Sequence, residues 1–552
     1  MAKLPLVKQF ERRLEALIEE YATWLTGYKD IADYVVPSRG RFLDRDTTPN
    51  DGKKRHSNVI DSTAIRALNV LGAGMQSGLT SPARPWYKLG LADKDLMEYT
   101  PVKLWLETVR KRMLSVFAGS NYYNATHNTY IELGGFGTGA KLIEEDMNSV
   151  IRCYPFTVGE YFLIADYSHR ISGMYRVYKG KAVNVVEDFG EDNVSSAVRR
   201  MAEDNKDEWV PIVHVIEKNP EANPQSLFSD KKAWRSVYYE KETREGNMLL
   251  RNKGYDEFPL TAPRWAVTGT ETYGKSPGWE ALGDVKMLQK MQQKSLKALD
   301  KLIDPPVNAP STLKNQGVTV IPGGVNWVNS TDGNQSFSAT YQINPDFMAI
   351  ENKIGKVQEQ IKEAFYVDLF LMLASSDRRQ ITATEVAERH EEKLLMVGPV
   401  IERIQPEMLD RDIDRVFGIM ERNGLFPEPP RELEGMNIEV EYISLLSQAQ
   451  KLVGKSSVES VAAFAADLSG IEPEVLDVID FDATVEEYAE MSGSPPRMIR
   501  SKEEREARRE ARRQQIAAQQ QLEAMSKLAP SAKALSETDM STDNALTRIS
   551  GG

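Results

Sequence analysis

The sequence predicts a mainly helical α+β fold, and three observations support this prediction. Stretches near the N-terminus and in the second half repeat apolar residues at the 3.6-residue spacing of helices. Residues 140–260 instead hold short runs of β-branched and aromatic residues typical of strands, for example Met174–Tyr178 and Val210–Val215. A Gly-, Asn- and Ser-rich insertion separates two of the predicted helices. With 552 residues, the chain is long enough for two or more packed regions.

The N-terminal part is predicted to be helical. Apolar residues from Phe10 to Leu25 recur at helical spacing. Asp61 or Ser62 suits the cap of a later helix, because a short polar side chain accepts hydrogen bonds from the first free N–H groups. We expect helices over Leu4–Tyr34, Ala64–Leu79 and Thr100–Phe117, with a polar, basic loop over Pro37–Ser57.

The stretch Ala281–Ile303 predicts a helix with two different faces. At 100° per residue, its lysines fall within an arc of about 80°; they are Lys286, Lys290, Lys294, Lys297 and Lys301. The apolar residues lie on roughly the opposite side; they are Val285, Leu288, Leu296, Leu299 and Ile303. One face therefore packs while the other presents a lysine stripe. Two prolines, Pro305 and Pro306, stop the helix.

The two predicted helices around the insertion form a stalk with a tip. The insertion covers Val307–Asn344, and a second helix begins near Pro345. Its apolar residues from Ile350 to Ala364 alternate in 4-3 spacing, which suits packing against neighbouring helices in a bundle or a ring. This helix also carries Lys353 and Lys356.

The C-terminal part continues the helical pattern. A polar break with Arg378 and Arg379 precedes a long helix over Thr384–Asn423 that ends at Gly424. Pro399 and Pro406 are expected to kink or break this helix. The segment Arg497–Arg513 holds eight basic and four acidic residues, and we expect the last residues, rich in Ser, Thr and Gly, to be disordered.

Composition restricts the classes of function. The net charge is −12 and the pI near 5.3, whereas a protein that grips DNA by neutralising phosphates is expected to be basic. A chain that lets DNA slide past it can be acidic. The single cysteine, Cys153, excludes intramolecular disulfides and cysteine-cluster metal sites. No apolar run approaches the length of a membrane span, so we expect no membrane partner.

Gly269–Ser276 matches the phosphate-loop pattern of nucleotide-binding proteins. That loop needs a strand before it and a helix that opens at its Lys-Ser, so that backbone N–H groups point at the phosphates. Here Pro277 follows directly, the next helix is expected several residues later, and no apolar strand ends in a convincing magnesium-binding Asp. The pattern therefore favours a structural turn over a nucleotide site.

The segment Gly134–Gly139 resembles part of a dinucleotide fingerprint, but it leaves a helix and enters a strand, which is the reverse of the required order. We expect a glycine hinge where chain segments pack closely. The five histidines are scattered without ligand spacing, and no acid–base or nucleophile constellation stands out. The sequence predicts no enzyme, no cofactor and no metal.

The lysine stripe has two interpretations. A solvated helix face is the usual explanation for a charge run. Alternatively, if the chain forms a ring, each lysine becomes one position of a belt that meets phosphates weakly and repeatedly. Arg378 and Arg379, between two helices, have the same two interpretations, because such a loop could project into a channel.

Four segments together resemble the head-to-tail connecting family of podovirus portal proteins. They are Asp61-Ser-Thr-Ala with Gly78-Leu-Thr-Ser-Pro82 and Pro85-Trp-Tyr-Lys-Leu89; Phe136-Gly-Thr-Gly139 with Glu144-Glu-Asp146; Tyr273-Gly-Lys-Ser-Pro277 with Ala281-Leu-Gly-Asp284; and Thr382-Ala-Thr-Glu385-Val with Arg389 and Gly398-Pro399. Their order and spacing span residues 1–440. The part beyond residue 495 is less distinctive, and the phosphate-loop match is a departure from the family pattern.

The resemblance implies a portal fold whose parts follow one another along the chain. They are an N-terminal wing region over residues 1–265, a first stem helix region over 266–304, a β-containing clip insert over 305–345, a second stem helix over 346–374, a tunnel loop over 375–383, a long wing helix and connection over 384–440, C-terminal wing and crown helices over 441–495, and a basic helical segment with its tail over 496–552.

The resemblance also implies a function: a ring of twelve subunits at one capsid vertex of the virion, assembled in the host cytoplasm, through which double-stranded DNA is packaged and ejected. The implied partners are other copies of the chain, DNA, the large terminase, a tail adaptor, capsid and scaffold proteins, and internal core proteins. Two alternatives stay open. One is another phage structural protein, such as an adaptor or a scaffold, and the other is a nucleotide-driven motor subunit that uses Gly269–Ser276.

Overall fold

In the computed structural model the chain divides into two units, Met1–Ser460 and Val461–Gly552. The structure describes residues 5–43, 56–93, 96–97, 99–204, 208–226, 228–241, 248–303, 307–308, 338–339, 346–375, 396–433, 435–452, 464–465, 468, 478, 480–485, 500 and 504–520. In the second unit a helix over residues 504–520 is almost entirely exposed, and its Arg509 pairs with Asp482 at 2.6 Å. Within the described residues, no helix is long and apolar enough to cross a membrane.

An antiparallel five-stranded sheet forms one half of the first unit. Its strands follow the order β4 (Tyr161–Ala165), β5 (Ile171–Lys181), β6 (Trp209–Lys218), β7 (Trp234–Glu240) and β8 (Arg251–Tyr255). The sequence prediction of strands in this region is confirmed. Between these strands lie two helices that the sequence did not predict, α6 (Ala182–Phe189) and α7 (Ser196–Asp204).

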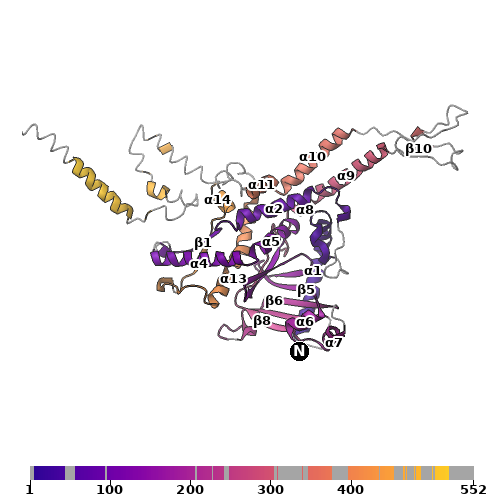
Figure 1. Cartoon of the computed structure of the whole chain (residues 1–552), viewed down its shortest axis with the longest axis horizontal. Coiled ribbons are helices and arrows are strands. Elements are labelled where there is room, and N and C mark those ends of the chain that lie inside the picture. Colours follow the sequence, from indigo (N-terminus) through magenta and orange to yellow (C-terminus); the bar gives the residue numbers. More distant parts are fainter. Residues whose placement is uncertain are drawn as a thin grey trace, which may run out of the picture. The chain divides into compact units, whose positions relative to one another are not determined.

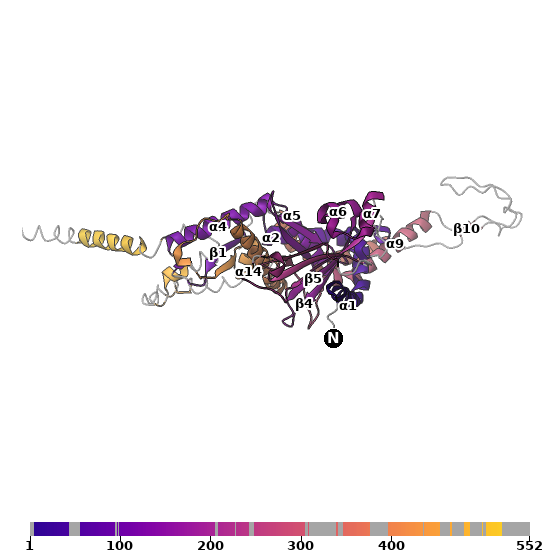
Figure 2. The ribbon, with the colours of Figure 1, turned by 90° about the horizontal axis from the view of Figure 1, so that it is seen from below.

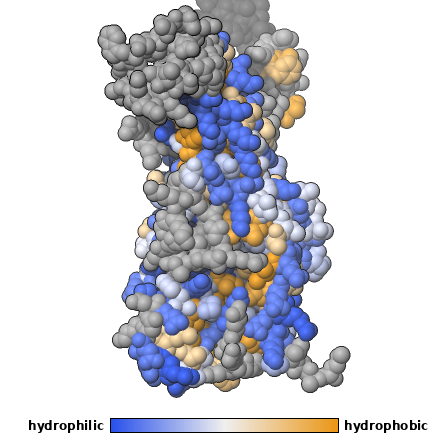
Figure 3. Space-filling view, turned by 90° about the vertical axis from the view of Figure 1, so that its right-hand side faces the viewer, coloured by the Kyte–Doolittle hydropathy of each residue, from blue (hydrophilic) through white to orange (hydrophobic). Residues whose placement is uncertain are grey.

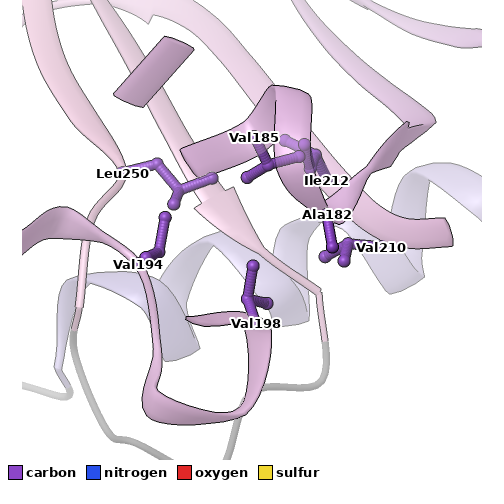
Figure 4. Packing of buried hydrophobic residues seen from close by; sticks show 7 residues of the cluster. All are labelled: Ala182, Val185, Val194, Val198, Val210, Ile212 and Leu250. Carbon is purple, nitrogen blue, oxygen red and sulfur yellow. The ribbon is translucent and has the colours of Figure 1, made fainter. Parts of the chain in front are cut away.

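The two faces of this sheet are covered by different elements (Figure 2). The N-terminal helix α1 (Leu6–Tyr34) covers one face, where Phe10 contacts the rings of Tyr175 and Tyr239. Helices α6 and α7 cover the other face. Their apolar residues meet Val210 and Ile212 of β6 in the cluster drawn in Figure 4. Alternate residues of β6 therefore serve the two layers, which explains why its sequence is almost continuously apolar.

The other half of the unit is built around smaller sheets and helices. Strand β2 (Ala140–Asp146) pairs with β3 (Val150–Phe156) and β9 (Leu260–Thr261), and β1 (Tyr87–Leu91) pairs with β12 (Ile438–Tyr442). The helices are α2 (Thr63–Leu79), α4 (Thr100–Gly119), α5 (Tyr122–Phe136), α13 (Asp410–Arg422) and α14 (Leu445–Leu452). The helices predicted over Leu4–Tyr34, Ala64–Leu79 and Thr100–Phe117 are confirmed as α1, α2 and α4. Helix α5 is the helix expected before the glycine-rich segment Gly134–Gly139, although its bounds were not predicted.

Two helices run away from this core side by side (Figure 1). They are α9 (Leu282–Ile303), which follows the short α8 (Pro277–Glu280), and α10 (Phe347–Ala364), which continues after a bend into α11 (Val367–Ser375). Between them, β10 (Val307–Asn308) pairs with β11 (Ser338–Ala339). The predicted pair of helices around an insertion is confirmed. The β-like pieces that the sequence predicts at 318–321 and 325–328 lie outside the described residues.

The long C-terminal helix predicted over Thr384–Asn423 is described from residue 396. Pro399 lies in regular helix over residues 396–404, so the helix is not broken there, whereas Pro406 lies in a π turn, Gln405–Leu409. A π turn leaves the regular hydrogen-bond pattern, so a residue without an N–H fits there. The predicted end is confirmed: Gly424 has a φ of 64°, and the Leu425 N–H donates to the Met420 carbonyl.

Candidate functional site

The candidate site is the surface of α9 and α10, where the sequence places the lysines. Lys290, Lys294 and Lys297 are exposed, as are Lys301, Lys353 and Lys356. The expectation that the lysines of α9 face away from its packing side is therefore met for these positions. Figure 3 views the molecule from the side of α9 and α10, which we call the stem helices; there blue polar surface is interrupted by orange apolar patches. Arg378 and Arg379 lie outside the described residues.

Lys286 differs from the rest of the stripe. Its Nζ lies 2.7 Å from Asp30 Oδ2 of α1 and 5.7 Å from the ring centre of Tyr34. Its side chain is 36% exposed. The sequence prediction grouped Lys286 with the other lysines of the stripe, but within the subunit this residue forms an ion pair that ties α9 to α1.

The apolar face of α9 is buried only in its first half. Val285 and Leu288 are fully buried. Leu296, Leu299 and Ile303 were predicted to pack in the same way, yet they are 48%, 41% and 67% exposed. Leu302 is 49% exposed, and so the second half of α9 carries exposed apolar side chains on one side and lysines on the other.

A carboxylate and three amides join both stem helices to the start of α2. Asp61 Oδ2 accepts hydrogen bonds from Gln292 of α9 at 3.3 Å and from Gln358 of α10 at 2.8 Å. Gln289 donates to the Asp61 carbonyl oxygen at 2.8 Å and accepts from the Asp61 N–H at 2.9 Å. We call Asp61, Gln289, Gln292 and Gln358 the stem clamp.

The electrostatics of the stem clamp favour a charged Asp61. Partial burial alone would raise its pKa, but hydrogen bonds from Thr63, Gln358 and Gln292 outweigh it, and the pKa lies below its usual value. Asp61 Oδ1 accepts from the Thr63 N–H at 2.8 Å. The sequence suggested Asp61 only as a helix cap, whereas here one carboxylate both caps α2 and holds two other helices.

The phosphate-loop match, Gly269–Ser276, forms a closed turn. Backbone hydrogen bonds join the motif to Ala266, three residues before it: the Lys275 N–H donates to the Ala266 carbonyl at 2.8 Å, and the Ala266 N–H donates to the Lys275 carbonyl at 3.2 Å. The Gly274 N–H donates to Thr138 Oγ1 at 2.9 Å. These N–H groups are used within the fold, so they do not form the open cradle that a phosphate needs.

Side chains complete this closed turn. Tyr273 is buried among the rings of Tyr21, Trp24 and Tyr28, and its hydroxyl accepts from the Leu163 N–H at 3.0 Å. The Ser276 hydroxyl donates to the Gly135 carbonyl at 2.7 Å. One expectation was wrong: a short helix, α8, opens at Pro277, directly after the motif and not several residues later.

The two glycine-rich motifs of the sequence pack against each other. A Cβ placed on Gly137, whose φ is 92°, would lie 2.2 Å from the Gly274 carbonyl oxygen. A Cβ on Gly278 would lie 2.2 Å from the Gly135 carbonyl oxygen. The expected close packing at Gly134–Gly139 is therefore confirmed. We call this contact of residues 134–139 with residues 274–278 the glycine seam.

The most strongly buried charges form a second cluster that the sequence did not indicate. Lys141 Nζ lies 2.6 Å from Asp412 Oδ2, and both side chains are fully buried. The Tyr122 hydroxyl donates to the same oxygen at 2.8 Å. Burial raises the pKa of Asp412, although the Lys141 charge opposes this. The cluster ties α5, β2 and α13 together, and its geometry indicates a structural ion pair.

The described histidines lie on separate segments of the fold. His214 is fully buried against the Tyr238 ring, with ring centroids 3.8 Å apart, and burial lowers its pKa well below the usual value. Among the residues that the structure describes, no group of three His, Cys, Asp or Glu side chains could hold a metal ion.

Sequence reasoning missed the partners of the stem residues. The stem clamp had one visible signal, the glutamines at positions 289 and 292 on the buried side of a helix that otherwise carries Lys and Leu. Asp30 as the partner of Lys286 had none, because the pair connects residues 256 positions apart.

Comparisons with known proteins agree on one family. A model of the bacteriophage head to tail connecting protein matches residues 7–499. A probable portal protein of Bordetella phage BPP-1 is 40% identical over 550 residues, which cover 99% of each chain. The portal protein of Salmonella phage epsilon15 is 40% identical over 540 residues, covering 98% of this chain and 97% of that protein.

Solved structures of gene transfer agent particles are more distant. A chain from the neck of an empty particle is 11% identical, with a TM-score of 0.36 over 79% of this chain and 91% of its own length. A chain from a native virion is 12% identical, with a TM-score of 0.33 over 77% and 94%. These scores are too low for any conclusion about this chain. The family model and the two phage relatives cover nearly the whole sequence, and the chain belongs to the bacteriophage head-to-tail connecting proteins.

Proposed function

We propose that this chain is one subunit of a portal ring that is assembled from twelve copies at one vertex of a phage capsid. Double-stranded DNA would pass through the ring during packaging and ejection. The large terminase and later a tail adaptor would bind at the insertion between α9 and α10. Capsid, scaffold and internal core proteins would contact the opposite end.

The observation that carries this proposal is the second half of α9. Its lysines and its apolar residues are both exposed, on opposite sides of one helix. Exposed leucines on a helix that projects from the core indicate a protein contact. In a ring, the apolar side of each α9 would be covered by the neighbouring subunit, and the lysine side would be left free.

The charge of the chain supports sliding of DNA. Twelve copies at −12 each sum to −144 (12 × −12), which gives a repulsive field around a duplex. Lysines at positions 290, 294, 297, 353 and 356, repeated by the ring symmetry, would guide the duplex through weak contacts. Arg378 and Arg379 are proposed to add contacts from the tunnel loop. Because each lysine would bind the DNA phosphates only weakly, the duplex could move through the ring without being held at one position.

The geometry gives no support to the nucleotide-driven motor. The N–H groups of Gly274 and Lys275 are bonded within the fold, and Tyr273 of the same turn is buried against aromatic rings of α1. The proposed role is therefore structural and not enzymatic. ATP binding that disappears in Lys275→Ala would contradict it.

The ring is tested by negative-stain electron microscopy of the purified chain, with native mass spectrometry to count subunits. We expect rings of about twelve subunits with a central hole and a narrow stalk. A small closed dimer without a channel would overturn the proposal.

The DNA-guiding role is tested with the exposed lysines. Lys290→Ala, Lys294→Ala and Lys297→Ala are combined in a particle, and the rates of packaging and ejection are measured. Lys286 is left unchanged because its loss would also break the contact with Asp30. Unchanged rates in assembled particles would remove the lysine belts from the mechanism and leave the ring intact.

A further inference from the structure

We propose that a hollow beside the first half of α4 binds an arginine side chain of a partner protein. The hollow has a volume of about 400 Å³ and lies between α4, the end of α13 and the connection that leads to β12. It is far along the chain from the stem helices, and the proposal does not depend on ring formation. A site of this volume has room for one or two side chains of a polypeptide.

Aromatic rings form the walls of the hollow. Phe417 and Phe426 lie with their ring centroids 4.9 Å apart, and Trp105 faces the same space. The Trp105 indole N–H donates to the Pro427 carbonyl at 3.0 Å, so the orientation of this ring is fixed. Pro427 and Pro429 add rigid apolar surface. The walls are therefore formed before any ligand binds.

Two carboxylates line the same space. Glu421 and Glu428 are both exposed, and neither makes an ion pair with another described residue. The neighbouring Arg422 is directed to Glu145 and Glu257, and Arg112 donates to the Leu425 carbonyl. Within the described part of the chain, no cation lies over Trp105, Phe417 or Phe426. The hollow thus combines ring faces and negative charge without a cation of its own.

Arginine fits this combination better than other ligands. Its flat guanidinium stacks on aromatic rings and donates paired hydrogen bonds to a carboxylate. An apolar side chain would leave Glu421 and Glu428 without a role in recognition. A nucleic-acid phosphate would be repelled by both. The charge complementarity therefore favours an arginine-bearing protein segment.

The test uses the full-length chain and a photo-crosslinking probe, acetyl-photoleucine-arginine-photoleucine amide. The matched probe carries citrulline, which keeps the shape of arginine without its charge. Crosslinked residues are mapped by mass spectrometry. We expect crosslinks to residues 424–438, with a yield about tenfold higher for arginine than for citrulline.

Two variants make the test specific. Glu421→Gln combined with Glu428→Gln changes only exposed groups and should lower the arginine yield to the citrulline level. Glu432→Gln, an exposed carboxylate outside the lining, should leave the yield unchanged. Equal yields from the two probes would show an apolar groove and overturn the proposal. So would crosslinks confined to other regions, or a full arginine yield in the double variant.

Discussion

The two halves of α9 carry the same sequence pattern but have different surroundings. In the first half, Val285 and Leu288 are buried and Gln289 belongs to the stem clamp. In the second half, Leu299 and Leu302 remain about half exposed, at 41% and 49%. Periodicity shows that a helix has an apolar face, but it does not show whether the face is covered by the same subunit or by another chain. The predictions below separate the anchored half from the free half.

The largest effect is expected where the glycine seam holds the base of the stem. Gly278→Ala places a Cβ 2.2 Å from the Gly135 carbonyl oxygen, and backbone atoms must shift to accommodate it. We expect a loss of stability of about 3 kcal/mol, measured as a shift of the urea unfolding midpoint. Gly283→Ala, with nothing within 4 Å of the added Cβ, is the matched control. An equal midpoint for both variants would contradict the seam as a rigid contact.

The free half of α9 should affect association and not folding. Leu299→Gln combined with Leu302→Gln removes exposed apolar surface, so the unfolding midpoint should stay the same. If a neighbouring subunit covers this face, the subunit concentration needed for half-assembly should rise about tenfold or more. Native mass spectrometry across a dilution series measures it. Gln293→Ala is the control, because Gln293 is exposed and lies toward the lysine side of α9; the concentration for half-assembly should stay unchanged.

The stem clamp should have an intermediate effect. Gln358→Ala removes a hydrogen bond to the Asp61 carboxylate, and we expect a loss of about 1 kcal/mol. In this variant we also expect faster amide hydrogen exchange in the first turns of α9 and in the middle of α10. Gln360→Ala, two residues away and exposed, should leave both rates unchanged. The same exchange rates in both variants would show that the clamp does not couple the helices.

The pH dependence of the clamp has a defined direction. The pKa of Asp61 is lower in the folded chain than its ordinary value of 3.8. The carboxylate therefore adds stability above that value, and the contribution is lost as the pH falls through the folded pKa. The stability difference between the parent chain and Asp61→Asn should be constant near neutral pH and shrink below about pH 4. A difference that grows on acidification would reverse the assigned role.

The smallest effect separates two lysines of one stripe. Lys286→Ala breaks a partly exposed ion pair with Asp30 and should cost about 0.5 kcal/mol, less at high salt. Lys290→Ala should cost nothing measurable, because Lys290 is exposed and makes no ion pair with a described residue. Equal effects of the two changes on the thermal midpoint would mean that the contact with Asp30 is not stabilising.

Local signals predicted the parts of the fold that depend on neighbours in sequence. The stem helices, the end of the long helix at Gly424 and the close packing at Gly134–Gly139 were all readable, because periodicity and glycine have local physical meaning. A helix was expected before Gly134, but the extent of α5, Tyr122–Phe136, was not predicted, because its sequence mixes polar and apolar residues on a helix buried on most sides. Long-range pairs, such as Lys286 with Asp30, depend on how distant segments meet, which a single sequence does not state.

The π turn at Gln405–Leu409 has a consequence for the rest of its helix. A turn of this kind holds one residue more than a regular one, and each residue turns a helix by about 100°. Removing a single residue here would keep the helix but turn Asp412 away from Lys141 and Arg415 away from Glu257, pairs that lie at 2.6 and 2.7 Å. The extra residue of the π turn thus sets the rotation of α13 about its axis. A one-residue deletion there should lower the stability of the fold more than any substitution of Pro406.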